Sequence, residues 1–113
     1  MNVHFDMQGD VTVLTLSGRL MGGGETNEFK DHIQKILDEG KTKIVVDLGR
    51  VKWMNSSAIG ILIAGLQKVR VVGGDIYLAR AGKRIISVFV TMQLEKVFKS
   101  FESVEEAVSE FGD

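Results

Sequence analysis

Length, composition and charge exclude several classes of protein. The chain has 113 residues, 44% hydrophobic and 26% charged, which indicates one globular domain over residues 1–113. It contains no cysteine, which excludes a disulfide scaffold, thiolate metal sites and a cysteine nucleophile. Fourteen basic and fifteen acidic residues leave a net charge of −1, so nucleic acid is not an expected partner.

The sequence offers no segment suited to a bilayer. Its longest apolar stretch, residues 58–66, is far shorter than the ~20 residues of a membrane-spanning helix. The first six residues lack the basic start and apolar block of a signal peptide. We therefore expect no membrane insertion and a cytoplasmic location.

The N-terminal third predicts a β-hairpin followed by a helix. Residues 2–8 alternate apolar and polar side chains, residues 11–16 are apolar or β-branched, and Gly9-Asp10 between them has turn chemistry. We expect these two segments to pair antiparallel. After a glycine-rich loop over residues 18–24, apolar side chains recur at helical spacing up to Gly40, a residue typical of helix C-termini.

The rest of the chain alternates strands and helices. Residues 43–48 form an apolar run without alternation, as expected for a central strand covered on both faces, and residues 49–54 are expected to form a loop. Further elements are predicted as a helix from residue 55 or 56 to 71, a strand over 75–79, a helix over 83–91, a strand over 96–101 and a helix from the capping box at 103–106.

These elements define the expected fold class. We expect an α/β protein with a mixed, mostly parallel sheet of about five strands, an N-terminal antiparallel hairpin and about four helices. The helix over residues 83–91 is expected to bury Ile85, Ile86, Val88 and Phe89.

Residues suited to catalysis do not fall into a catalytic pattern. His4 lies on a predicted edge strand and His32 on the exposed side of the first helix, so both are expected to be solvated. Glu25, Asp47 and Asp75 could hold a magnesium ion, although no spacing rule brings them together. We therefore expect no catalytic residue, no metal site, no cofactor and no enzymatic activity.

One segment does carry a functional pattern, because Asn55-Ser56-Ser57 follows two large apolar residues at the predicted start of a helix. If Asn55 is the N-cap, the serines occupy the first two helical positions. Backbone amides lack partners there and the helix dipole favours negative charge, so a phosphoryl group would be tolerated. Two other interpretations stay open: the serines only cap the helix, or the amides of residues 22–24 bind a nucleotide or another anion.

The residues resemble the STAS domain family (sulfate transporter and anti-sigma factor antagonist) in its small stand-alone bacterial form. The resemblance rests on residues 13–20, on residues 44–48 and above all on residues 54–60. In the last of these segments the family typically has Asp-Ser-Ser-Gly-Leu-Gly. This chain has Asn55 in place of the aspartate, and Met21 where the family has an acidic residue.

The resemblance implies a partner switch. An unphosphorylated antagonist of this family binds an anti-sigma factor that is also a serine kinase, and the sigma factor is released. The kinase then phosphorylates the second serine of the motif, here Ser57, with Ser56 the second choice, and a metal-dependent serine phosphatase restores the binding form. The alternative is a constitutive regulatory subunit of a transporter or another signalling complex.

The resemblance also implies an oligomeric state and a set of partner-binding residues. The chain is expected to be a monomer or weak dimer. The residues expected to contact the partner are Met21, Gly22, Trp53, Met54, Asn55, Ser56, Ser57 and Ile59.

Overall fold

The computed structural model describes residues 2–112, apart from the side chains at positions 25 and 26. Nine elements follow one another along the chain. They are β1 (Asn2–Gln8), β2 (Val11–Leu20), α1 (Glu25–Asp38), β3 (Lys43–Met54), α2 (Ser56–Val71), β4 (Asp75–Ala79), α3 (Lys83–Thr91), β5 (Ser100–Phe101) and α4 (Val104–Gly112).

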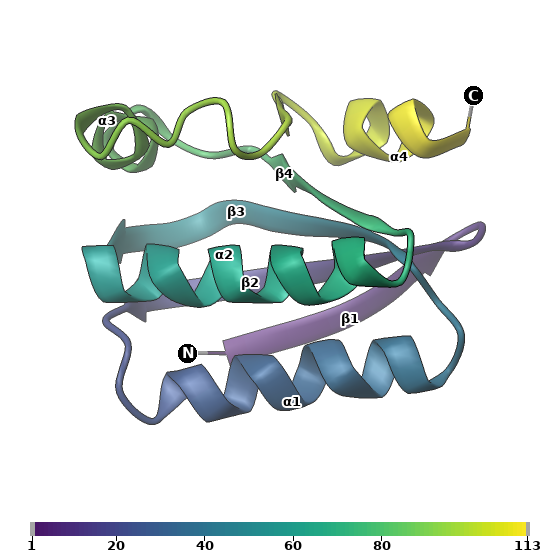
Figure 1. Ribbon diagram of the computed structural model, residues 1–113. Coiled ribbons are helices and arrows are strands. Elements are labelled where there is room, and N and C mark those ends of the chain that lie inside the picture. Colours follow the sequence, from purple (N-terminus) through teal and green to yellow (C-terminus); the bar gives the residue numbers. More distant parts are fainter. Residues whose placement is uncertain (1, 113) are drawn as a thin grey trace.

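The five strands form one sheet in the order β1-β2-β3-β4-β5 (Figure 1). β1 and β2 are antiparallel and the other neighbours are parallel, which confirms the expected hairpin and mixed sheet. β3 is the central strand and is buried from Ile44 to Leu48. The expected α/β fold class with five strands and four helices is therefore confirmed.

Two apolar clusters hold the layers together. The larger cluster joins α1 and α2 to one face of the sheet through side chains such as Phe29, Ile33 and Leu66. The smaller cluster joins α4 to the opposite face, where Phe111 stacks on Tyr77 at a ring-centroid distance of 4.0 Å. The sheet thus has a helical layer on each face, and its strand ends remain available for other roles.

The segment over residues 49–54, predicted to be a loop, is instead the second half of β3. β3 stops pairing with β4 at Asp47, whereas it continues beside β2 as far as the Leu20–Met54 pair. Two irregularities in register accompany this extension. The result is a two-stranded parallel ribbon that extends past the rest of the sheet.

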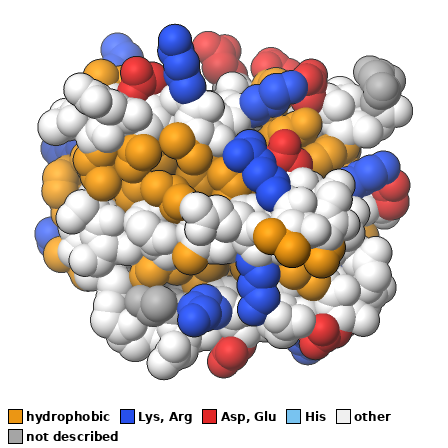
Figure 2. Space-filling view, viewed as in Figure 1, with side chains coloured by type: hydrophobic (Ala, Val, Ile, Leu, Met, Phe, Trp, Pro, Cys, Tyr) orange, Lys and Arg blue, Asp and Glu red, His pale blue; other side chains and the backbone are white. Residues whose placement is uncertain are grey.

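Two expectations near the C-terminus need correction. The last strand covers only Ser100–Phe101, because residues 95–97 form a turn, in which the amide of Val97 donates to the carbonyl of Leu94 at 3.0 Å. In α3 the side chains of Ile85 and Phe89 are buried, but Ile86 is 43% exposed, because only one face of this short helix meets the core. Figure 2 shows apolar side chains gathered on the surface between α2 and α3.

Candidate functional site

The serine pair lies at the tip of the β2–β3 ribbon. β3 ends at Met54, Asn55 follows in an extended conformation, and α2 begins at Ser56. The backbone amide of Asn55 donates to the Leu20 carbonyl at 3.2 Å, so the ribbon continues for one more hydrogen bond before the helix starts. Ser56 and Ser57 are therefore the first two residues of α2, as the sequence predicted.

Asn55 is the N-cap of α2 and also holds the neighbouring loop. Its side-chain oxygen accepts a hydrogen bond from the amide of Ala58 at 2.9 Å. Its side-chain nitrogen donates to the carbonyl oxygen of Met21, also at 2.9 Å. An aspartate could reproduce the first bond but has no hydrogen to donate in the second. One asparagine thus ties the helix start to the loop after β2.

Because Asn55 is the cap, the hydroxyl groups of Ser56 and Ser57 are not needed for that purpose. Both side chains are exposed. This removes the structural basis of the interpretation in which the two serines serve only as helix caps. By position, the first amides of α2 have no intrahelical acceptor, and its first turn carries no acidic residue. The helix end is therefore a favourable place for added negative charge.

The loop after β2 lies directly against Ser57. Gly22 has a φ of +86°, and a Cβ atom built there would lie 2.8 Å from the Cβ of Ser57. Only glycine fits this position without displacing the loop or the serine. The sequence showed a glycine-rich loop and a serine pair, but only the fold brings Gly22 and Ser57 into contact.

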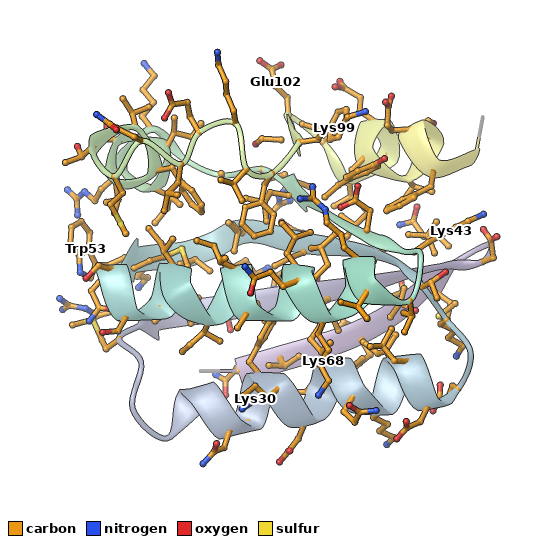
Figure 3. The ribbon with its side chains drawn as sticks, in the orientation of Figure 1. Lys30, Lys43, Trp53, Lys68, Lys99 and Glu102 are labelled. Atoms are coloured by element: carbon orange, nitrogen blue, oxygen red, sulfur yellow. The ribbon has the colours of Figure 1, made fainter. Side chains whose placement is uncertain are left out.

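Met21 and Trp53 place apolar surface beside the serines. The side chain of Met21 is 48% exposed and that of Trp53 is half-buried. Trp53 is paired in register with Arg19 of β2, which is exposed. In Figure 3 the Trp53 side chain lies at the same end of the molecule as the start of α2. Exposed apolar groups next to polar ones are typical of a protein-binding surface.

Met54 and Ile59 do not belong to that surface, and the prediction is wrong for these two side chains. Both are fully buried in the larger core cluster. Successive side chains of a strand point to opposite faces, so Met54 points into the core next to the half-exposed Trp53. Ile59 follows Asn55 by about one helical turn, on the side of α2 that packs on the sheet.

We use the name Ser57 surface for the six predicted contact residues that remain accessible. They are Met21, Gly22, Trp53, Asn55, Ser56 and Ser57.

Two of the three carboxylates considered for magnesium form ion pairs with arginine residues. Asp47 is buried and forms an ion pair with Arg80 at 3.1 Å. Asp75 forms one with Arg70 at 3.2 Å. The third candidate, the side chain at position 25, lies outside the described residues. Among the side chains that the structure describes, no three His, Cys, Asp or Glu residues are grouped to hold a metal ion.

The predicted histidines also have structural surroundings. His4 is exposed on β1 as expected. His32 is half-buried, because its ring packs edge-on against Phe5 at a centroid distance of 4.9 Å. The expectation of a solvated His32 is therefore wrong. None of the helices in the described part of the chain is long and apolar enough to span a membrane.

The fold, with its mixed five-stranded sheet and the asparagine-capped serine pair at the start of α2, defines a small α/β domain. The STAS domain family matches residues 2–107, and the chain belongs to that family.

Three comparisons place this chain among particular STAS proteins. A protein of Thermotoga neapolitana, named as a candidate anti-sigma factor antagonist, is 28% identical over 97 residues, covering 80% of this chain and 86% of that protein. A crystal structure of a candidate anti-sigma factor antagonist from Thermotoga maritima has a TM-score of 0.88 at 21% identity, covering 98% and 95% of the two chains.

The third comparison is with the anti-sigma factor antagonist SpoIIAA, at 20% identity in both of its forms. The unphosphorylated form has a TM-score of 0.82 and covers 98% of this chain and 96% of its own. The phosphorylated form, described as a Bacillus cell fate determinant, has a TM-score of 0.74 and covers 97% and 99%. At these identities the solved structures establish a shared fold.

Proposed function

We propose that this protein is an anti-sigma factor antagonist that binds an anti-sigma factor kinase and is switched off by phosphorylation at Ser57. The observation that carries the proposal is the exposed Ser57 hydroxyl at the second position of α2, beside a cap that does not use it. Support comes from the relatives named for this function and from the existence of SpoIIAA in both phosphorylation states.

The proposed chemistry is a phosphoryl transfer in which this chain is the substrate. The Ser57 oxygen bonds to the γ-phosphorus of ATP, ADP leaves, and a base of the kinase takes the hydroxyl proton. The nucleotide and its magnesium ions belong to the kinase, so this chain acts by binding and has no cofactor of its own. A metal-dependent phosphatase would reverse the step with water and release inorganic phosphate.

The geometry explains how the fold tolerates the modification. A phosphoserine adds about −1.5 to −2 charges, and the start of a helix stabilises negative charge. Gly22 already fills the space on one side of Ser57. A phosphoryl group on Ser57 therefore extends outward, into the space that a bound partner would occupy.

The same charge would disrupt partner binding. An interface formed on the Ser57 surface must exclude water from Met21 and Trp53, and burying a phosphate there without a matching cation is costly. A difference of 1.4 kcal/mol already changes affinity tenfold. Binding is thus lost through local bulk and charge, without refolding.

The test compares Ser57 with the serine beside it. We expect phosphate on Ser57 after incubation with the cognate kinase and magnesium-ATP, measured by mass spectrometry, and none on Ser57→Ala. Ser57→Ala should still bind the kinase, whereas Ser57→Asp should bind at least about tenfold more weakly in titration calorimetry. Ser56→Ala is the matched control because it removes the adjacent exposed hydroxyl.

Two results would contradict this proposal. One is phosphate on Ser56 with Ser57 unmodified. The other is undiminished kinase binding by Ser57→Asp, provided that the circular dichroism spectrum shows the variant to be folded.

A further inference from the structure

We propose that β1 pairs with β1 of a second copy of this chain, antiparallel and centred on Phe5, to form a symmetric dimer with one continuous sheet. Within residues 2–112, β1 pairs with β2 alone, so its other side is an open sheet edge (Figure 1). An open edge presents backbone donors and acceptors to any strand that fits it. Neither the family assignment nor the proposed phosphorylation concerns this edge.

The hairpin turn determines which backbone groups face outward. Gly9 and Asp10 form a two-residue turn with positive φ at Gly9, and Gln8 pairs with Val11 across it. The pair that closes such a turn is hydrogen-bonded, and hydrogen-bonded pairs then alternate along the strands. Even-numbered residues of β1 therefore direct their backbone groups to β2. Val3, Phe5 and Met7 direct theirs to the open edge.

A hydrogen bond at Met7 agrees with this alternation. The Met7 amide donates to the side-chain oxygen of Asp6 at 2.9 Å. In the dimer that amide would donate to Val3 of the second copy. The carboxylate of Asp6 would then be released to face a new partner.

Two polar side chains of β1 favour one register. With Phe5 opposite Phe5 of the second copy, His4 lies opposite Asp6 in both halves of the interface. These are non-hydrogen-bonded pairs, in which the side chains are closest. A shift by two residues in either direction instead aligns His4 with His4 or Asp6 with Asp6. The centred register alone places the His4 imidazole, a hydrogen-bond donor, opposite the Asp6 carboxylate, an acceptor, and it pairs all seven residues of β1.

The apolar side chains of β1 favour the same register. Phe5 is 40% exposed and Met7 is 41% exposed. Both line a groove of about 590 Å³ between β1 and α1, together with His32 and Ile36. In the centred register Phe5 meets Phe5 and Met7 meets Val3 on this side of the sheet. Two exposed apolar side chains of each copy would thus lose water contact.

Sedimentation equilibrium tests whether the dimer exists and uses this edge. We expect a reversible dimer with a dissociation constant below about 1 mM. Phe5→Lys should abolish it, because it places two lysines opposite each other at the centre. Val71→Lys is the matched control, since Val71 is an exposed valine on α2 and the change adds the same charge. A wild-type protein that stays monomeric at 1 mM, or a dimer that Phe5→Lys leaves intact, would overturn the proposal.

Two further sets of variants test the register. His4→Asp and Asp6→His should each weaken the dimer about tenfold, because positions 4 and 6 of the two copies then carry the same side chain, and the double exchange should restore it. Because the chain has no cysteine, Phe5→Cys should give a disulfide-linked dimer on mild oxidation. Met7→Cys should not, because its two copies would lie about 13 Å apart along the strands, beyond disulfide reach.

The outcomes separate this proposal from the proposed function. A dimer in which the double exchange gives no rescue, or in which Met7→Cys links as readily as Phe5→Cys, would show that β1 does not pair in this register. None of the residues that pair belongs to the Ser57 surface. Loss of kinase binding by Ser57→Asp and loss of the dimer by Phe5→Lys are therefore independent results.

Discussion

At the scale of single residues, the Ser57 surface depends on contacts that neighbouring positions cannot replace. The side chain of Asn55 accepts a hydrogen bond from the start of α2 through its oxygen and donates one to the Met21 carbonyl through its nitrogen. Gly22 allows the loop to approach Ser57 more closely than any side chain would permit. Each of these contacts gives a substitution whose effect can be compared with that of a similar residue nearby.

The asparagine is tested by Asn55→Asp. The carboxylate still caps α2 but cannot donate to the Met21 carbonyl, a loss of about 1 kcal/mol. We expect hydrogen exchange of the amides at 21–24 to accelerate about fivefold, while that of the α2 amides stays unchanged. Asn27→Asp is the control, since it makes the same change at an exposed residue of α1. Unaltered exchange at 21–24 would show that Asn55 does not hold the loop.

The glycine is tested by Gly22→Ala against Gly23→Ala. Both residues have positive φ, which costs an alanine about 1–2 kcal/mol. A Cβ at Gly23 meets nothing within 4 Å, whereas one at Gly22 overlaps Ser57. We expect Gly22→Ala to lower the free energy of unfolding by about 1–3 kcal/mol more than Gly23→Ala in urea denaturation. Equal losses would mean that the loop moves away from Ser57 at no cost.

At the scale of elements, an ion pair joins the middle of β3, where it stops pairing with β4, to the residue that follows β4. A side-chain oxygen of the buried Asp47 accepts from the amide of Gly49 at 2.9 Å and pairs with Arg80 at 3.1 Å. Arg80 follows β4 with a φ of +58°, an unfavourable conformation for a residue other than glycine. Its backbone amide donates to Phe101 of β5 at 2.9 Å. Arg80, a strained residue, thus connects β4 to both of its neighbours, β3 and β5.

Two substitutions separate the ion pair from the backbone strain. Arg80→Ala loses the pair and keeps the strain, and we expect a loss of about 2 kcal/mol, limited because the arginine side chain is 45% exposed. Arg80→Gly loses the pair but relieves the strain, so it should be about 1 kcal/mol more stable than Arg80→Ala. Arg84→Ala, an exposed arginine of α3, should have little effect. An Arg80→Gly variant less stable than Arg80→Ala would contradict this account of Arg80.

At the scale of the whole molecule, three exposed ion pairs give stability a defined pH dependence. The Lys43 ammonium bonds to Asp10 and lowers the pKa of that carboxyl below its usual 3.8. Lys41 likewise lowers the pKa of Glu39 below 4.5. Hydrogen bonding to Glu110 raises the pKa of Lys99 above 10.5. The Asp10 and Glu39 pairs therefore stabilise the folded state at pH values above the usual carboxyl pKa. The Lys99 pair stabilises it at pH values below the usual lysine pKa.

The ion pair between Asp10 and Lys43 allows a test of this pH dependence. A lowered pKa means that the folded state holds fewer protons, so the stabilisation is lost as the pH falls through the lowered value. We expect Asp10→Asn to be less stable than wild type at about pH 7 and equally stable near pH 2. In a Lys43→Gln background the same substitution should have a much smaller effect at about pH 7, because the Lys43 ammonium is the main cause of the lowered pKa of Asp10. Figure 3 shows Lys43 at the end of the molecule where the hairpin turns, far from Trp53.

Local sequence signals predicted most of the fold but only part of the candidate site. The strand at Asp75–Ala79 and the helix at Lys83–Thr91 were predicted with their observed bounds, and a glycine directly precedes each of the two segments. Residues 49–54 were not predicted as a strand, since Gly49 and Arg50 interrupt the apolar run. Only the partner strand reveals it, because β2 is long enough to pair there.

The same limit applies at the site. The serine pair and its asparagine cap could be predicted from neighbouring residues. The contact of Gly22 with Ser57 joins residues 35 positions apart, and the burial of Met54 depends on which face of β3 meets the core. Such properties arise from the packing of separate segments and leave no local pattern.

The burial of Met54 has a consequence for any enzyme that modifies Ser57. Ser57 lies three residues from Met54, which is buried in the interior, and is itself the second residue of α2, so the chain around it has no freedom to straighten. A kinase that needs an extended peptide in its cleft could not reach this hydroxyl without unfolding the domain. Recognition would have to be of a rigid three-dimensional surface, and a peptide copied from these residues would lack the shape that is read.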